Sequence, residues 1–237
     1  MEYLVFQHVP DEHPGLIANY FQERNIGFDV VRFFEDNARI PENVSDYRGL
    51  IIMGGPMGVY DNRDKFPSKE DEIAVIRANM GKLPMLGICL GSQLLAHVLG
   101  GKVDRNLVGG KHTKEVGIYK VELTNAGISN PIFKGFSSPV EVMEWHGDMF
   151  TVPNGATLLA SSQLCRNQAF VAKGNMYATL FHFEMTPKMF GELAKIDKDW
   201  IPPEINVEEM LKEVIEKEEL MRRQSVMLMD NFVGSSR

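Results

Sequence analysis

A cysteine between two glycines is the residue of this chain best placed to do chemistry. Cys89 follows an apolar run over residues 84–88, which predicts a short buried strand, and it precedes apolar residues at helical spacing over residues 94–99. Gly87 and Gly91 permit the sharp turn that joins such a strand to a helix. Amides at a helix N-terminus favour the thiolate form of a nearby cysteine. The pattern predicts a nucleophile elbow, although a lone buried cysteine is more often just a small hydrophobic residue.

A histidine and a glutamate near the end of the last apolar run supply the other groups that this chemistry requires. A cysteine nucleophile needs a base that takes its proton and returns it to a leaving amine, and the base needs an acceptor that orients it. His182 and Glu184 stand two residues apart, so extended backbone sends both side chains to the same side. Alone, such a pair would be read as a surface histidine beside a solvated carboxylate. Together with the elbow, it predicts a triad of Cys89, His182 and Glu184.

A glycine-rich turn over residues 54–58 follows another apolar run, at residues 49–53. In an open parallel sheet the loops after the strands line a common crevice, so this turn is expected to face the elbow. The amides of Gly55 and Leu90 then become candidates for an oxyanion hole. A turn of this composition is most often only a turn. It is not a phosphate-binding loop, because the lysine and serine of such a loop are missing.

The elements that must position these groups are predicted from hydrophobic periodicity. Strand, helix and strand alternate over residues 3–34, and a strand at 49–53 and a helix at 68–80 follow, which indicates a parallel sheet. After residue 101 the expected strands are 116–123, 140–145, 157–160, 169–172 and 176–181, followed by helices at 186–195 and 207–229. We expect one domain over residues 1–237, with 200–237 a helical extension whose apolar face lies on the body or on a second subunit.

Composition excludes several classes of protein. The 237 residues carry 32 acidic and 25 basic side chains, a net charge of −7, without a basic run longer than two, so nucleic acid is not an expected partner. The first residues do not resemble a signal peptide, and no apolar stretch reaches membrane-spanning length, so a cytoplasmic protein without membrane contact is expected. Cys89 and Cys165 are the two cysteines, which excludes a disulfide framework and a four-thiolate zinc site. No cofactor or catalytic metal is expected, because the histidines lack ligand spacing.

Four segments taken together resemble the class I glutamine amidotransferases, particularly the amidotransferase domain of GMP synthase. They are residues 54–57, 87–93, 145–148 and 181–184, and their order and spacing agree over about residues 1–190. The resemblance implies a flavodoxin-like α/β fold, an open and mostly parallel sheet with helices on both faces. It also implies that Cys89 forms a glutamyl thioester, with His182 as general base and Glu184 as the residue that orients it.

The same resemblance extends to the groups that would hold the substrate. It implies an oxyanion hole at Gly55 and Leu90, and it matches Gln93 to the family position that holds glutamine. The backbone around His146 and Gly147 would bind the amino acid end of the substrate. Asp148 is expected to shape that loop, while Cys165 is expected to be structural, and the remaining histidines, among them His8 and His112, lack a matching partner.

The chain departs from the family pattern in places. Residues 178–180 read Ala-Thr-Leu where the family has Gly-Val-Gln, and Phe183 stands where it has proline. No pyrophosphatase loop is present, so the chain is not expected to make GMP alone. The expected activity is hydrolysis of a γ-glutamyl amide, glutamine first, to glutamate and ammonia.

Three other interpretations stay open at this stage. The chain could be a γ-glutamyl peptidase that acts on glutathione-like compounds. It could instead be an ammonia-delivering or regulatory subunit of a partner synthetase, or a homo-oligomer without such a partner. A catalytically inactive binding protein is the last alternative.

Overall fold

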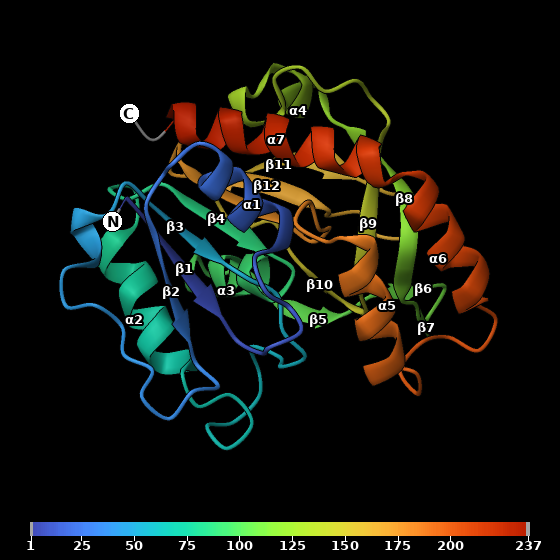
Figure 1. The fold of residues 1–237 in the computed structure, drawn as a ribbon, viewed down its shortest axis with the longest axis horizontal. Helices are drawn as coiled ribbons and strands as arrows, with labels where there is room; N and C mark the ends of the chain where they lie inside the picture. Colours follow the sequence, from blue (N-terminus) through green and yellow to red (C-terminus); the bar gives the residue numbers. More distant parts are fainter. Residues whose placement is uncertain (1, 236–237) are drawn as a thin grey trace.

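A single large sheet organises the molecule (Figure 1). The computed structural model describes residues 2–235, and within them nine strands are ordered β2-β1-β3-β4-β13-β12-β11-β8-β9. The first five of these pair in parallel: β2 (Phe28–Arg32), β1 (Tyr3–Gln7), β3 (Gly49–Ile52), β4 (Met85–Ile88) and β13 (Met176–Thr179). The other four pair antiparallel: β12 (Ala169–Ala172), β11 (Thr157–Ser161), β8 (Glu115–Leu123) and β9 (Val140–His146). The predicted α/β fold with an open sheet is confirmed.

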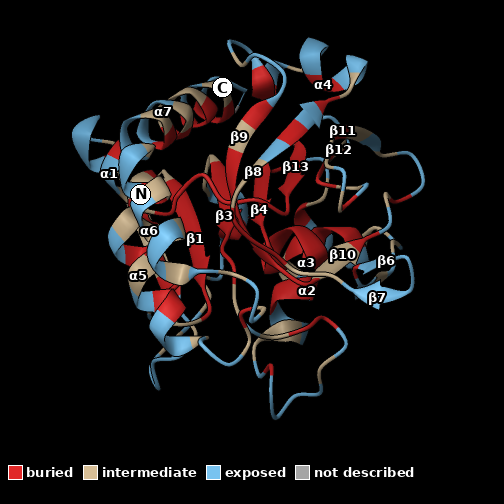
Figure 2. Ribbon diagram, turned by 90° about the vertical axis from the view of Figure 1, so that its right-hand side faces the viewer, coloured by how far each residue is buried: buried red, intermediate tan, exposed pale blue. Residues whose placement is uncertain are grey.

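Helices cover both faces of the sheet, as predicted. One face packs against α1 (Gly15–Glu23) and α7 (Glu218–Ser235), and the other packs against α2 (Lys69–Asn79) and α3 (Leu90–Val98). Alternate residues of a central strand therefore enter different apolar clusters: Tyr3 and Val5 face α1 and α7, while Leu4 and Phe6 face the opposite side. This two-sided burial explains why the strands read as continuous apolar runs (Figure 2).

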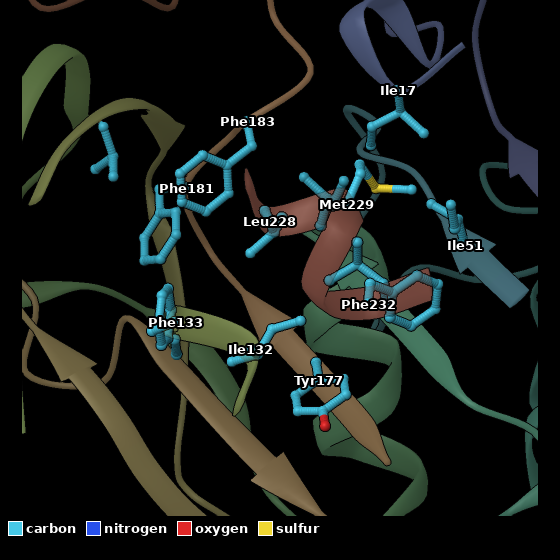
Figure 3. Close-up of a cluster of buried hydrophobic side chains, with 14 of the residues drawn as sticks. Ile17, Ile51, Ile132, Phe133, Tyr177, Phe181, Phe183, Leu228, Met229 and Phe232 are labelled. Carbon is cyan, nitrogen blue, oxygen red and sulfur yellow. The ribbon is translucent and has the colours of Figure 1, made fainter. Parts of the chain in front are cut away.

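The cluster between the sheet and α7 joins distant parts of the chain (Figure 3). Ile17 of α1 and Ile51 of β3 lie in the same cluster as Leu228 and Phe232 of α7, and all four side chains are buried. Tyr177 of β13 belongs to it as well, with its ring centroid 6.4 Å from that of Phe232. The C-terminal helix is therefore packed onto the body of the protein.

The helix predicted over residues 207–229 is two helices, so that prediction is wrong in detail. α6 (Val207–Glu216) and α7, which begins at Glu218, are separated by Lys217. The two helices bury their apolar residues in different clusters, since Val214 packs with α5 (Pro187–Ile196) while Leu228 packs with α1. Tertiary packing imposes the break, because Lys217 is neither glycine nor proline and its ammonium pairs with Glu141 at 2.8 Å.

Short elements complete the fold. They are β5 (Val103–Arg105), β6 (Leu107–Val108), β7 (Lys111–His112), β10 (Asp148–Phe150), α4 (Asn125–Ser129), η1 (Val44–Asp46) and η2 (Pro131–Phe133). The sequence did not predict them, since two to five residues carry too little periodicity. Among the described residues, no helix combines the length and apolar character that crossing a membrane requires.

The two glycines beside Cys89 allow α3 to pack directly on the sheet. A methyl group on Gly91 would lie 2.1 Å from the carbonyl oxygen of Ile52 in β3, and one on Gly87 would lie 2.5 Å from the carbonyl oxygen of Gly91. Both contacts are with backbone and cannot be relieved by a side-chain rotation. The glycines therefore serve close packing rather than an unusual backbone conformation.

Gly91→Ala should lower the free energy of unfolding by about 2–3 kcal/mol, because the added carbon overpacks a rigid backbone contact. Chemical denaturation measures the change. Gly234→Ala is the matched control, since it lies in α7 with nothing within 4 Å of the added carbon, and it should be neutral or slightly stabilising. Equal stability of the two variants would contradict the packing described here.

Candidate active site

Cys89 stands at the turn between β4 and α3 in a strained backbone conformation. Its φ of 49° and ψ of −107° lie in a region that costs on the order of 1–3 kcal/mol for a residue other than glycine. Surrounding hydrogen bonds hold it there: the Cys89 amide donates to the Thr179 carbonyl at 2.9 Å, and its carbonyl accepts from the Ser92 hydroxyl at 2.6 Å. The predicted strand-turn-helix elbow is present, with the strain on the cysteine itself.

The imidazole of His182 lies close to the Cys89 sulfur because their strands are parallel neighbours. β4 and β13 pair in register from Met85 to Ile88, and the residues that follow each strand emerge at the same edge of the sheet. The amide of His182 is fixed by a 2.8 Å bond to the Met143 carbonyl. Two segments 93 positions apart in the sequence are thereby brought to one point.

Glu184 orients that imidazole. Its Oε1 lies 2.6 Å from His182 Nδ1, and because a carboxylate only accepts, Nδ1 carries the proton. His182 Nε2 is buried and makes no hydrogen bond of ordinary geometry with the described residues. Burial lowers the pKa of His182, but the carboxylate of Glu184 and the nearby Cys89 side chain outweigh it, so the pKa is raised well above the usual value. The three predicted triad residues are thus gathered in one place.

Gly55, on the loop after β3, lies against Leu90, the first residue of α3. A methyl group on Gly55 would come 2.9 Å from Leu90 Cδ2 and 3.2 Å from His8 Cβ, so a side chain would close the gap between the loops. Neither backbone amide has a hydrogen-bond partner among the described residues. Two free amides next to a cysteine are the donors that a developing oxyanion requires.

A cavity of about 440 Å³ opens above Cys89. Gly55, predicted for the oxyanion hole, lines it together with Gln93, His146 and Gly147, the residues predicted to bind a substrate. His182 and Glu184 do not line the cavity; they are 2% and 1% exposed and lie beneath it. Leu90 is fully buried as well, so its amide rather than its side chain is available to a ligand.

The side chain of His146 is held in a buried ionic cluster. Its Nε2 lies 3.1 Å from carboxylate oxygens of both Glu115 and Glu144, and its Nδ1 donates to the Asp148 carbonyl at 3.0 Å. Burial lowers the pKa of His146, but its interactions with the Glu115 and Glu144 carboxylates raise it to about 10, so the ring is an imidazolium. Burial raises the pKa of Glu144 to about 7. The ring therefore anchors the end of β9 and leaves the adjacent backbone to face the cavity.

Sequence reasoning missed three residues of the site. His8 donates to the Gly54 carbonyl at 2.8 Å and pairs with Glu72 at 2.9 Å, which fixes the glycine turn. His112 Nε2 donates to the Gly147 carbonyl at 2.8 Å. Glu12, from the loop after β1, lines the cavity. The partners of the two histidines lie up to 64 positions away in the sequence. No local spacing pattern predicts pairs so far apart.

Three features define the class of protein: an α/β fold, a cysteine at a strand-helix turn, and a buried His-Glu pair in the segment that follows the neighbouring strand β13. Comparisons with known proteins define the family. The model of the glutamine amidotransferase class-I family matches residues 12–196. The chain belongs to this family.

Individual relatives agree with this assignment. The glutamine amidotransferase-like protein YfeJ of Salmonella typhimurium is 32% identical over 183 residues, which cover 76% of this chain and 74% of that protein. The crystal structure of a glutamine amidotransferase from Thermotoga maritima superposes with a TM-score of 0.87 at 30% identity and covers 98% of each chain. The glutamine-hydrolysing GMP synthase of Porphyromonas gingivalis is 29% identical over 212 residues, which cover 85% of this chain but 38% of that enzyme. One subunit of the glutamine-hydrolysing GMP synthase of Saccharolobus solfataricus is 35% identical over 146 residues, which cover 61% of this chain and 71% of that relative.

His146→Gln should lower the free energy of unfolding by about 3 kcal/mol near neutral pH, because Glu115 and Glu144 would both lose the buried cation with which they pair. The folded protein holds the His146 proton to about pH 10, whereas the unfolded chain releases it near pH 6.5. The stabilisation is therefore complete below pH 6.5 and is lost as pH rises toward 10.

Urea denaturation of wild type and variant across this pH range tests the assignment. The difference in the free energy of unfolding between wild type and His146→Gln should become smaller as pH rises. His97→Gln, on the exposed side of α3, is the control and should match wild type. A difference in the free energy of unfolding that stays constant or grows with pH would contradict a buried imidazolium at His146.

Proposed function

We propose that this chain hydrolyses the γ-amide of a γ-glutamyl compound, with free glutamine as the first candidate and glutamate and ammonia as products. One observation carries the proposal. A strained cysteine that lines a cavity follows β4, which pairs in register with β13, and a buried, carboxylate-oriented imidazole follows β13 at the same edge of the sheet. The family supports the substrate class, because the GMP synthases that resemble the chain are glutamine-hydrolysing.

The proposed first half-reaction forms a thioester. His182 Nε2 takes the proton of the Cys89 thiol, and the sulfur attacks the γ-carbonyl carbon. The amides of Gly55 and Leu90 bind the oxygen as its negative charge develops, where a single donor is worth roughly a hundredfold or more in rate. His182 then gives its proton to the nitrogen, the carbon-nitrogen bond breaks and ammonia leaves.

The second half-reaction returns the enzyme to its starting state. His182 takes a proton from a water molecule, which attacks the thioester carbon; the carbon-sulfur bond then breaks, His182 returns the proton to the Cys89 sulfur, and glutamate is released. Glu184 keeps Nδ1 protonated throughout, so Nε2 is the atom that exchanges protons. In this proposal Gln93 and the backbone at His146 and Gly147 hold the amino acid end of the substrate.

A γ-glutamyl peptidase is the second candidate. Arg105 and Lys114 line the same cavity as Cys89 and are cations that suit the carboxylate of a glutathione-like tail. A component of a larger synthetase is the third candidate, since the chain resembles a protein that is one part of the Saccharolobus GMP synthase. Such a component would show little turnover without its partner.

Turnover by the purified chain, with glutamine and glutathione assayed in parallel, tests these functions. Cys89→Ala should lower kcat by about ten-thousandfold or more, and His182→Gln should do so as well, because both remove a group that acts in the transition state. Cys165→Ala and His97→Gln are the matched controls and should keep activity.

The ratio of the turnover rates with glutamine and with glutathione separates an amidase from a peptidase. Activity that needs an added synthetase would favour the third candidate. Retention of full activity by Cys89→Ala, or the absence of glutamate release from every γ-glutamyl compound with and without candidate partners, would overturn the proposal.

A further inference from the structure

Glu12 lies on a loop that is fixed at both ends above the site. The loop joins β1 to α1, and near its start the Gln7 amide group donates to the carbonyls of Val9 and Pro10 at 2.9 and 3.3 Å. At its far end the Leu16 amide donates to the Glu184 carbonyl at 2.8 Å. A carboxylate on such a loop is held in position rather than free to turn into solvent.

The Glu12 carboxylate is buried beside the imidazole that serves as base. Glu12 is 8% exposed and lines the cavity that contains Cys89. A methyl group on Gly54 would lie 2.1 Å from Glu12 Oε2 and 3.4 Å from His182 Cε1. Because Gly54 has no side chain, the carboxylate of Glu12 and the ring of His182 border the same small space. The Glu12 carboxylate makes no hydrogen bond or ion pair with the described residues, and its oxygens are not among the fully buried polar atoms, so they are open to the cavity.

Four charged groups act on Glu12: His8 on the same loop, His182 and Glu184 on the segment after β13, and Asp197 at the end of α5. Burial raises the pKa of Glu12 to about 7; the imidazoles of His182 and His8 oppose that rise, and the carboxylates of Glu184 and Asp197 add to it. Glu12 therefore changes charge close to neutral pH. The Glu12 carboxylate can therefore form a hydrogen bond or an ion pair with a ligand that enters the cavity.

We propose that the Glu12 carboxylate receives the nitrogen leaving group, accepting a hydrogen bond from the N–H of the scissile amide and then from the released ammonia or ammonium. This inference rests on the proposed function. If the γ-carbonyl oxygen binds the amides of Gly55 and Leu90, the amide nitrogen points toward His182, and Glu12 stands beside that ring. The ligand of this subsite is a primary amide or a small amine.

The reaction balances without a further reactant. The sulfur-carbon bond forms, the carbon-nitrogen bond breaks, and the proton held by His182 passes to the nitrogen. Glu12 gains and loses no atom; it accepts hydrogen bonds from a nitrogen that gains positive charge as His182 protonates it, so its contribution is larger in the transition state than in the bound substrate.

A γ-ester provides the test, because its leaving oxygen has no N–H to donate. The experiment compares kcat/KM for glutamine and for the γ-methyl ester of glutamate in wild type, Glu12→Gln and Asp11→Asn. Glu12→Gln should lower kcat/KM for glutamine by about tenfold to a hundredfold, the range expected for a hydrogen bond to a charged group. Its activity on the ester should stay within about threefold of wild type, which also shows that the variant is folded.

The pH profile gives an independent readout. In wild type kcat/KM for glutamine should rise through about pH 7 as Glu12 ionises, and Glu12→Gln should lack that rise. Asp11→Asn, which changes the neighbouring carboxylate outside the cavity, should behave as wild type.

Each other outcome overturns the inference. Equal losses on amide and ester in Glu12→Gln would show that the residue only supports the loop, and unchanged activity on both would show that it does not meet the leaving group. A wild-type protein inactive on both compounds, with and without candidate partners, would overturn the hydrolysis of free glutamine on which this inference rests, which distinguishes that failure from a failure confined to Glu12.

Discussion

The parallel pairing of β4 with β13 is the constraint on which the rest of the structure depends. These strands are neighbours, so the residues that follow them, Cys89 and His182, emerge at one edge of the sheet. Close packing of α3, which Gly87 and Gly91 allow, then fixes where the cysteine turns. The strain at Cys89 is tolerated because the sheet on one side and the helix on the other leave it no relaxed alternative.

Buried ion pairs near this edge of the sheet hold the walls of the cavity in place. The site places three histidines against carboxylates: His8 with Glu72, His146 with Glu115 and Glu144, and His182 with Glu184. Each of these groups fixes one segment beside the cavity, so buried ionic contacts behind the cavity wall hold that wall in position. Glu12 differs from these carboxylates because it has no partner among the residues that the structure describes, which is why a ligand is the natural occupant of the space before it.

The sequence predicted those parts of the site that short-range chemistry specifies. The elbow at Cys89 and the spacing of His182 and Glu184 are local patterns, and the parallel order of the strands follows from the alternation of elements. The roles of Glu12 and His112 could not be predicted, because their neighbours are set by the crossing of loops distant in sequence. The break at Lys217 was missed for a related reason: two apolar clusters compete for one amphipathic stretch, and only tertiary packing decides between them.

The central claim is that the Cys89 sulfur forms a covalent bond to the substrate while His182 moves the proton. Mass spectrometry of the intact protein, quenched in acid during turnover of glutamine, measures that bond directly. The account predicts a glutamyl adduct that peptide mapping places on Cys89, that is absent from Cys89→Ala, and that accumulates when release from the thioester is slowed. Turnover without any adduct under those conditions, or an adduct on another residue, would contradict it.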